Sequence, residues 1–252
     1  MPISNASLLD EDFSAIDDWT NGDQAPATST QETFDGQETL YQNTHESAVG
    51  NDYAYLYRTI GSIEGLGNTI AVSIKLYHDL IGTIANTDNF VFNCFRSDWK
   101  FSVVFASDGL FISDGATYNE VGTNIVSQDA WQEWTFIFDF SGGVANATCD
   151  VYLKIAGIYV LQASDVDCSN IGDFSGLDGY LELECFGYAT DNLITYVDYL
   201  KIGDDVLDIS SIQINIGDVW KTVTGMQINI GDIWKTVTGI QINIGDVWKT
   251  IF

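Results

Sequence analysis

Carboxylates are the most numerous ionisable side chains in this sequence. The chain has 252 residues, and 36 of them are Asp or Glu against 9 Lys or Arg. Carboxylate oxygens are the ligands that Ca²⁺ prefers in proteins. The segment Asp165-x-Asp167-x-Ser169 begins like a Ca²⁺-binding loop. Such a loop needs a glycine and a bidentate glutamate where this chain has Asn170 and Gly176, so a cation site and an ordinary turn both stay open.

Catalysis by a serine or cysteine nucleophile would need a histidine placed beside the nucleophile. The chain has two histidines, His45 in a polar segment and His78 near the end of a strand-like run. It contains no G-x-S-x-G motif and no G-x-x-x-x-G-K phosphate-binding loop. We therefore expect both histidines at the surface, and neither a nucleophilic hydrolase nor a P-loop nucleotide site.

The four cysteines do not form a metal-binding pattern. None belongs to a C-x-x-C pair, so a structural zinc site is not expected. Cys94 and Cys185 lie in strand-like runs and are expected to be buried as small hydrophobic residues. Cys149 and Cys168 would flank a hairpin and are the pair to expect if a disulfide forms, although nothing in the sequence indicates an oxidising compartment.

The charge balance argues against two large classes of partner. The net charge is −27 at neutral pH, whereas nucleic acid phosphates and anionic lipid headgroups are bound by clustered cations. We therefore expect neither nucleic acid nor a membrane as a partner. No apolar run approaches the roughly 20 residues of a membrane-spanning helix. The opening segment MPISNASLLDED lacks the cationic and apolar parts of a signal peptide.

Alternation of apolar and polar residues with a period of two dominates the chain, as in Ile70, Val72, Ile74 and Leu76. Such runs, rich in β-branched and aromatic residues and bounded by Gly, Asn, Asp or Ser, predict β-strands. Around a dozen of them without an amphipathic helix predict an all-β fold, either a two-sheet sandwich or a barrel. Residues 15–52 are polar and weakly patterned, and are expected to form long loops with one short strand near Leu40.

Aromatic residues mark a candidate surface for sugars. Tyr53, Tyr55 and Tyr57 alternate and would share one face of a strand, while Trp99 and Trp131 begin strands. Exposed rings can form a platform for a sugar, but a stripe of this kind also packs against its own sheet. Both interpretations stay open, because the sequence does not tell which rings face water.

The C-terminus carries a tandem repeat with a period of 14 residues. The repeats start at Ile212 (IQINIGDVWKTVTG), Met226 (MQINIGDIWKTVTG) and Ile240 (IQINIGDVWKTIF). Each complete repeat divides into five strand residues, the turn Gly-Asp, five strand residues and the turn Thr-Gly. This division predicts a small β-meander of three hairpin repeats over residues 212–252, which follows a first domain of residues 1–211.

The predicted meander has two faces and no net charge. Residues 212–252 hold three Asp and three Lys, whereas residues 1–211 hold 33 acidic and 6 basic residues. A neutral module with apolar side chains on both faces is expected to mediate attachment or self-association. A plain extension of the first domain, or a recent duplication with no special role, stays open. The expected assembly residues are Ile214, Ile228 and Ile242 on one face, and Trp220, Trp234 and Trp248 on the other, about 9–10 Å apart on alternate strands.

Three segments resemble a concanavalin A-like, laminin-G-like jelly roll over about residues 8–208. They are LLDEDFSAIDDWTNGD, WQEWTFIFDFS with the following CDVYLKIAGIYV, and ITYVDYLKIGDDV. The resemblance implies an antiparallel jelly-roll β-sandwich whose last strand pairs beside the first. It also implies a structural Ca²⁺ between these strands, with Glu11 or Asp12 and Asp198 as the counterpart ligands. The alternative is that Asp198 only faces solvent.

Glucanases of this fold carry E-x-D-x-x-E on one strand, where two carboxylates act on the glycosidic bond. The nearest segment here has Glu184 in place of the aspartate and Gly187 in place of the last glutamate, after Glu182. The resemblance therefore implies a protein that is not an enzyme.

The INIGDVWKTVTG repeats resemble short tandem repeats at the ends of phage and prophage structural proteins. The two resemblances together imply a virion structural protein, either a surface decoration or a fibre-type subunit. Its expected place is the virion surface, after assembly in the host cytoplasm. The expected partners are other virion proteins or copies of itself, together with host-surface glycans. A glycan-binding lectin or adhesin module is the alternative function, with a glycoside hydrolase behind it.

Overall fold

The protein is almost entirely β, and its described residues contain no α-helix. The chain divides into two compact units, Pro2–Val206 and Leu207–Phe252, a few residues before the predicted boundary between residues 211 and 212. No helix among the described residues has the length and hydropathy needed to cross a bilayer. The structure, a computed structural model, describes residues 3–5, 9–44, 51–62, 69–81, 89–96, 99–113, 117–143, 146–169, 178–188, 193–203, 205–206, 212–216, 219–223, 227–230, 233–236, 241–244 and 247–250.

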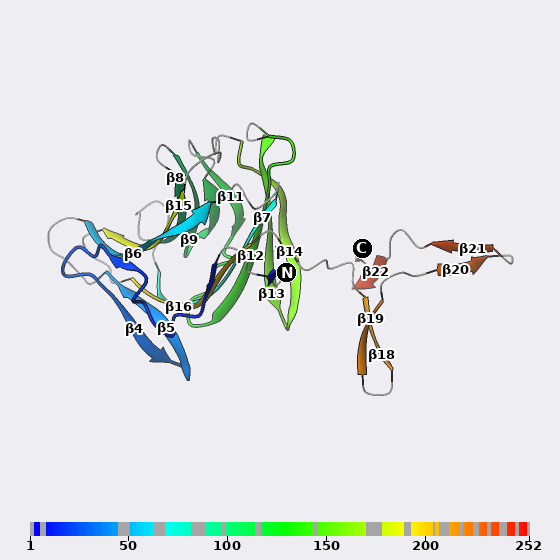
Figure 1. Cartoon of the computed structure of the whole chain (residues 1–252), viewed down its shortest axis with the longest axis horizontal. Helices are drawn as coiled ribbons and strands as arrows, with labels where there is room; N and C mark the ends of the chain where they lie inside the picture. Colours follow the sequence, from blue (N-terminus) through cyan, green and yellow to red (C-terminus); the bar gives the residue numbers. More distant parts are fainter. Residues whose placement is uncertain are drawn as a thin grey trace. The chain divides into compact units, whose positions relative to one another are not determined.

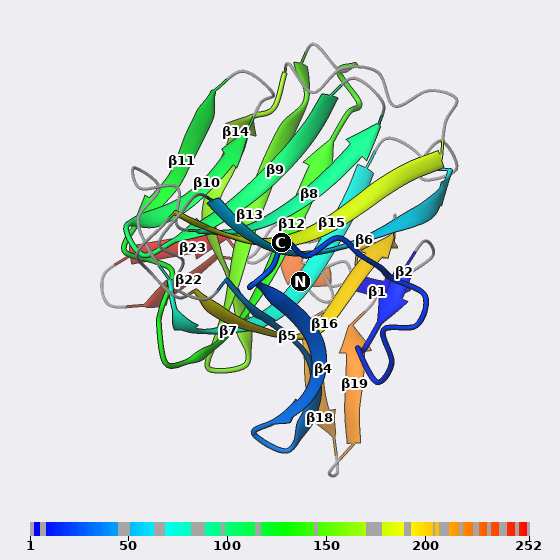
Figure 2. The same ribbon diagram turned by 90° about the vertical axis from the view of Figure 1, so that its left-hand side faces the viewer.

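Two antiparallel sheets form the first unit and face each other as layers (Figures 1 and 2). The seven-stranded sheet has the order β11 (Tyr118–Thr123), β10 (Gly109–Ser113), β9 (Trp99–Ala106), β8 (Asn89–Arg96), β15 (Asp178–Tyr188), β6 (Asn51–Ser62) and β3 (Thr20–Asn21). The other sheet has eight strands, in the order β14 (Ile158–Asp167), β13 (Thr148–Ile155), β12 (Trp131–Asp139), β7 (Thr69–Leu80), β16 (Ile194–Gly203), β5 (Gln37–Asn43) and β4 (Thr28–Phe34), with β2 (Leu9–Glu11) paired to β16 outside this order. The predicted all-β sandwich is confirmed.

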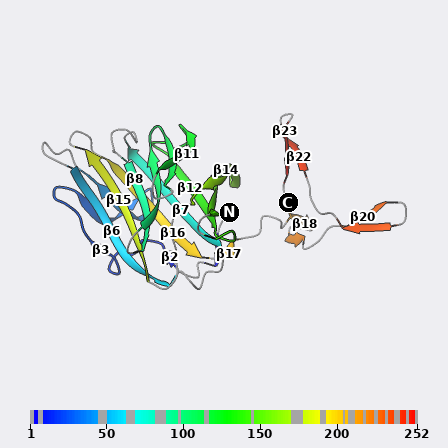
Figure 3. The same ribbon diagram turned by 90° about the horizontal axis from the view of Figure 1, so that it is seen from above.

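The core lies between the two layers, which are seen from above in Figure 3. Alternate residues of the central strands point inward, as in β12, and the largest fully buried side chain among the described residues is that of Trp134. The Gln42 side chain ties the sheets together, because its Nε2 donates to the carbonyl oxygens of Ala54 at 2.9 Å and Leu183 at 3.0 Å in the opposite sheet. Hydrophobic burial and this polar bridge fix which face of each strand is turned outward.

The first and last strands of the sandwich are neighbours, as the jelly-roll resemblance predicted. Strand β2 (Leu9–Glu11) pairs with β16, so that Glu11 lies opposite Leu200. The short strands β1 (Ile3–Asn5) and β17 (Asp205–Val206) form a further two-stranded sheet. The two ends of the sandwich segment are therefore joined by backbone hydrogen bonds.

The expectation of long loops over residues 15–52 is wrong, although the strand predicted near Leu40 is present as part of β5. Strands β4 and β5, of seven residues each, form a hairpin there that is joined by Asp35 and Gly36. Both turn residues have positive φ values, 52° and 78°, which an Asp-Gly turn between two strands adopts at small cost. The many Thr residues and polar outward side chains suit a strand at the sheet edge, which explains why apolar alternation was weak.

In the second unit, each repeat forms its own two-stranded antiparallel sheet. The register within the first repeat places Ile216 opposite Val219 and Ile212 opposite Val223. Over the described residues, no strand of one repeat pairs with a strand of another repeat. The repeats therefore form three separate sheets, whereas the sequence predicted one continuous meander. The strands are β18 (Ile212–Ile216), β19 (Val219–Val223), β20 (Gln227–Ile230), β21 (Ile233–Thr236), β22 (Gln241–Ile244) and β23 (Val247–Thr250).

Candidate functional site

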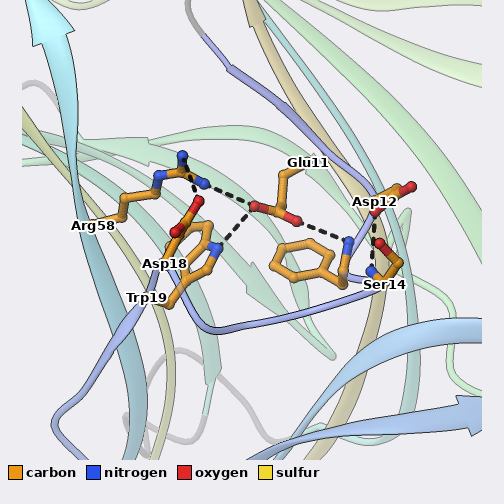
Figure 4. Close-up of polar contacts among 7 residues, drawn as sticks. Glu11, Asp12, Ser14, Asp18, Trp19 and Arg58 are labelled. Atoms are coloured by element: carbon orange, nitrogen blue, oxygen red, sulfur yellow. Dashed lines mark hydrogen bonds and ion pairs between the residues drawn. The ribbon is translucent and has the colours of Figure 1, made fainter.

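Glu11, one of the predicted Ca²⁺ ligands, is already held by groups of the chain itself. Its Oε2 accepts hydrogen bonds from the Trp19 Nε1 at 3.0 Å and from the Arg58 guanidinium at 2.9 Å. Its Oε1 accepts from the Phe13 backbone amide at 3.0 Å. Figure 4 shows the carboxylate between these partners. With its side chain only 11% exposed, Glu11 acts as a structural anion that satisfies a buried indole and pairs with a cation.

The other two predicted ligands are not brought to Glu11. Asp12 points away in Figure 4 and caps the Ser14 amide at 3.0 Å, a bond that lowers the pKa of Asp12. Asp198 pairs with the Lys75 Nζ at 2.6 Å. Among the described residues, no group of three or more acidic, histidine or cysteine side chains could hold a metal ion. Among the residues that the structure describes, Glu11, Asp12 and Asp198 therefore do not come together as a ligand set for the implied Ca²⁺.

The segment Asp165–Ser169, the other candidate for a Ca²⁺ site, begins in a strand and not in a loop. Asp165 and Asp167 belong to strand β14, and the Asp165 amide donates to the Asp150 Oδ1 on the neighbouring strand at 2.9 Å. The Asp167 carboxylate caps the Ser169 amide at 2.8 Å. Asn170 and Gly176 lie outside the described residues. The first half of the segment is thus a strand end and a turn, rather than half of a cation-binding loop.

The predicted tyrosine stripe lies on the outer face of the seven-stranded sheet. Ala54 and Leu56 between the tyrosines are buried in the core, so Tyr53, Tyr55 and Tyr57 point outward from β6 and are partly exposed. The register with β15 places Tyr55 opposite Glu184, Tyr57 opposite Glu182 and Tyr53 opposite Phe186. The sequence predicted the stripe, but the carboxylates beside it come from a strand more than 120 residues later in the chain.

A short segment of the chain supports the middle of this face. Strand β3 and the following residues run along β6, with the Gly22 amide donating to the Tyr55 carbonyl oxygen at 3.0 Å. A Cβ on Gly22 would lie 2.0 Å from the Tyr55 ring, so only glycine allows this approach. The Asp23 carboxylate fixes the segment, because its Oδ1 accepts from the Tyr55 amide at 2.8 Å and from the Ser29 hydroxyl at 2.7 Å.

The electrostatics of this face are strongly negative. Burial, and then the charges of Glu182, Glu184 and Asp23, raise the pKa of Tyr55, so its hydroxyl stays protonated and can donate a hydrogen bond. The rings of Tyr55 and Tyr57 are 6.0 Å apart and nearly parallel, at 26°. The Tyr53 and Phe186 rings are 4.7 Å apart. We refer to Tyr53, Tyr55, Tyr57, Glu182, Glu184 and Phe186 as the tyrosine face.

Sequence reasoning missed a second aromatic surface, on the outer face of the eight-stranded sheet. Across β5, β16, β7 and β12, Tyr41 lies opposite Tyr196, Tyr196 opposite Tyr77, and Tyr77 opposite Trp131. Phe34 from the tip of the β4–β5 hairpin stacks on Tyr196, with ring centroids 3.9 Å apart and an angle of 11°. The chain itself therefore covers the centre of this row.

Polar contacts hold the hairpin tip in that place. The Trp131 Nε1 donates to the Asp35 Oδ2 at 3.2 Å, and the Lys75 Nζ donates to the Gln37 Oε1 at 2.7 Å. The same ammonium group lies 4.8 Å from the centre of the Trp131 ring. Because this second row is occupied by its own hairpin, the tyrosine face is the better candidate for a ligand.

The prediction of surface histidines is wrong for His78. Its side chain is fully buried, the Nδ1 is 2.9 Å from the Thr195 hydroxyl, and the rings of Phe90 and Phe105 lie 5.8 Å away. Burial lowers the pKa of His78 to about 3. An imidazole in this state exchanges no protons with a substrate at the surface. His45 lies outside the described residues.

The cysteine predictions are tested in part. Cys185 is buried, as expected, and burial raises its pKa to about 12. The side chain of Cys94 lies outside the described residues. Cys149 and Cys168 are also buried and are both free thiols in this structure.

The assembly residues stay a prediction. The structure describes only the backbone at Trp220, Trp234 and Trp248, where the register places them opposite Asn215, Asn229 and Asn243. Ile214, Ile228 and Ile242 lie opposite the three lysines of the repeats, and their side chains are also outside the described part. The predicted 9–10 Å spacing of the tryptophans assumed one continuous sheet, which the described strands do not form.

No family model and no curated protein matches this sequence. Solved structures are similar in fold. Lectin I of Ulex europaeus, solved in complex with the methyl glycoside of α-L-fucose, is 11% identical with a TM-score of 0.51, and the match covers 78% of this chain and 98% of the lectin. The Emp46p carbohydrate recognition domain in its metal-free form is 9% identical with a TM-score of 0.50, over 82% of this chain and 100% of the domain.

A seed lectin of Lotus tetragonolobus is also similar, at 9% identity and a TM-score of 0.50, over 77% of this chain and 96% of the lectin. Identities this low show a common fold and nothing finer. The sandwich of this chain therefore has the concanavalin A-like architecture of the legume lectins, in agreement with the jelly-roll resemblance of its sequence.

Proposed function

We propose that the sandwich binds neutral carbohydrate on the tyrosine face. The observation that carries this proposal is the register of β6 and β15, which sets aromatic rings directly beside two carboxylates. A sugar ring has C–H faces that pack on aromatic rings and hydroxyl groups that donate to carboxylates. A surface that offers both groups in neighbouring positions matches this combination.

The charge of the face favours neutral sugars. Glu182, Glu184 and Asp23 all act on Tyr55, and the chain as a whole carries −27. An acidic sugar would be repelled by these groups and by the overall field. The fold likeness to a lectin that was solved with a fucoside supports carbohydrate binding as the function of the sandwich.

We propose binding without turnover. Gly187 stands where the glucanase motif has its last glutamate, so one member of the catalytic set is missing beside Glu182 and Glu184. Release of reducing sugar from a bound oligosaccharide by the wild-type protein, abolished in Glu182→Gln, would contradict this part of the proposal.

A glycan array that displays neutral and acidic oligosaccharides, followed by titration calorimetry on the best neutral sugar, tests the binding site. Tyr57→Ala removes an outward ring and is expected to weaken binding about fivefold, because one stacking contact contributes on the order of 1 kcal/mol. Tyr118→Ala, which removes an exposed tyrosine (56%) on the distant strand β11 of the same sheet, is the matched control and should bind as the wild type does. The proposal fails if no neutral glycan binds, or if both variants bind equally well.

The C-terminal repeats favour a second role, that of a virion surface subunit which joins other virion proteins or copies of itself. The resemblance of the repeats to those of phage structural proteins supports it, as does their neutral charge beside a sandwich of −27. Stoichiometric presence in purified particles is the expected result. A gene that lies among polysaccharide-uptake genes, in a culture that yields no particle, would contradict the virion role and leave the carbohydrate proposal standing.

A further inference from the structure

Two cysteines meet at the open end of the β13–β14 hairpin. Cys149 on β13 lies opposite Val166 on β14. One rung further, the Cys168 amide donates to the Ala147 carbonyl oxygen at 2.9 Å, so Cys168 lies opposite Ala147. Cys149 and Cys168 are therefore diagonal neighbours across an antiparallel pair, and they point to the same face of the sheet.

That face is the inner one. The side chains of both cysteines are fully buried and belong to the hydrophobic core. After burial, the Cys168 thiol is the next group that raises the pKa of Cys149, so the two side chains interact. Otherwise each thiol donates only a weak bond to a nearby carbonyl, Cys149 to that of Asp150 at 3.6 Å and Cys168 to that of Val166 at 3.4 Å.

We propose that Cys149 and Cys168 form a reversible disulfide, with a low-molecular-weight disulfide such as oxidised glutathione as the oxidant. A disulfide needs Cα atoms about 4.4–6.8 Å apart and side chains that point toward each other. Diagonal neighbours on one face of an antiparallel pair lie about 7–8 Å apart, so the edge strand β14 has to move toward β13 for the bond to form. The bond would fasten β14, the edge strand of its sheet, to β13 at the end where the hairpin opens.

The reaction balances with this oxidant alone. The thiolate of one cysteine attacks a sulfur of the small disulfide, forms a mixed disulfide and expels one small thiolate. The second cysteine loses its proton and attacks the protein sulfur of that mixed disulfide, which expels the other small thiolate. Two electrons pass from the cysteines to the oxidant, and the two protons end on the released thiols.

Burial makes the pair slow to react in the folded chain. It raises the pKa of Cys149, so that little thiolate is present, and it keeps the oxidant away from both sulfurs. Reaction then requires the edge strand to open or the chain to be still folding. The structure thus predicts rapid oxidation during refolding and slow oxidation of the native protein.

The test is to refold the full chain with oxidised glutathione, and separately with dithiothreitol, followed by peptide mapping under non-reducing conditions. We expect one peptide pair, linked through Cys149 and Cys168. The melting temperature of the oxidised protein should exceed that of the reduced protein by about 5–10 °C, since a cross-link that closes a loop of this length restricts the unfolded chain.

Two single-cysteine variants test whether the rise in melting temperature comes from this pair. Cys149→Ser should show no rise in melting temperature with the oxidant, whereas Cys185→Ser removes another buried thiol and should show the full rise. Alkylation of both Cys149 and Cys168 after refolding with the oxidant would overturn the proposal. So would a glutathione adduct that never resolves, or a link from either residue to Cys94 or Cys185.

Discussion

His78 is the single residue whose environment most clearly governs how the fold responds to pH. The imidazole is fully buried beside Phe90 and Phe105, and its Nε2 has no hydrogen-bond partner among the described residues. The Thr195 hydroxyl that lies beside the His78 Nδ1 also interacts with the buried Cys185 thiol. Burial disfavours the charged imidazolium and lowers the pKa of His78 to about 3.

Acid should therefore destabilise the fold through His78. An unfolded histidine binds its proton near pH 6.5, whereas the folded one does so only near pH 3. Between these values the unfolded state holds the extra proton, so the free energy of unfolding falls by about 1.4 kcal/mol for each pH unit of acidification. Above pH 6.5 this group has no effect.

Urea unfolding at pH 7 and pH 5 measures the effect. The wild type should lose about 2 kcal/mol more than His78→Asn over this interval, because the variant cannot titrate while the response of the carboxylates stays the same. His78→Asn keeps a hydrogen-bond donor for the Thr195 hydroxyl. Any loss of stability that the substitution itself causes is the same at both pH values, so it does not affect the difference in the free energy of unfolding between pH 7 and pH 5. Equal slopes for the two proteins would show that His78 is not the neutral, buried group described here.

Some of these residue environments could be predicted from the sequence and others could not. The alternation of Ile74 and Leu76 continues to His78, so the inward position of His78 was legible although we expected it at the surface. Glu11 and Asp198 were expected to bind Ca²⁺, but Arg58 and Lys75 neutralise them. Those partners come from other strands, and sequence patterns within one strand do not fix the register between distant strands.

At the scale of elements, the turn of the β13–β14 hairpin has an alanine, Ala156, at a position with positive φ, which alanine adopts unfavourably. Ile155 pairs with Ile158, which leaves Ala156 and Gly157 as a two-residue turn with φ values of 51° and 83°. Such turns favour Asn or Asp before glycine, because these residues tolerate positive φ better than alanine does. The β4–β5 hairpin already has Asp35 in the corresponding place, with a φ of 52°.

Ala156→Asn should therefore stabilise the protein by about 0.5–1 kcal/mol, measured as a shift of the urea midpoint with an unchanged slope. Ala156 is exposed, so the longer side chain extends into solvent. Ala156→Val is the control, since a β-branched residue at positive φ should destabilise the fold. If both variants lower the midpoint, the turn does not have the conformation described.

Alternation within a strand predicts which residues share a face, whereas the pairing between strands decides which residues of the tyrosine face are neighbours. Period-two alternation predicted most of the core strands and the outward stripe of Tyr53, Tyr55 and Tyr57. It could not place Glu182 beside Tyr57, nor align Tyr41, Tyr196, Tyr77 and Trp131 into one row, because those alignments are made by hydrogen-bonded pairing between strands far apart in sequence. The aromatic row on four strands is for that reason visible only in the folded sheet.

At the scale of the whole molecule, the charge is unevenly divided along the chain. Residues 1–211 hold 33 acidic and 6 basic residues, whereas the repeats of residues 212–252 hold three of each sign. Two sandwiches therefore repel each other, and most strongly at low ionic strength. Electrostatic repulsion between copies, or between this chain and another acidic particle protein, is weakest at the neutral repeats. The repeats are therefore the part of the chain where such contacts form most easily.

A chain that ends after Ser211 tests whether the repeats drive assembly. We expect it to keep the far-ultraviolet circular dichroism of the sandwich and to be monomeric in light scattering at low salt, while the full chain forms oligomers. Alanine at Trp220, Trp234 and Trp248 in the full chain is the finer variant, since tryptophan is enriched among the residues that dominate interfaces. It should reproduce the loss of assembly without shortening the chain. Assembly of the shortened chain to the same size as the full chain would refute the role of the repeats, and its unfolding would show that they complete the core of the sandwich.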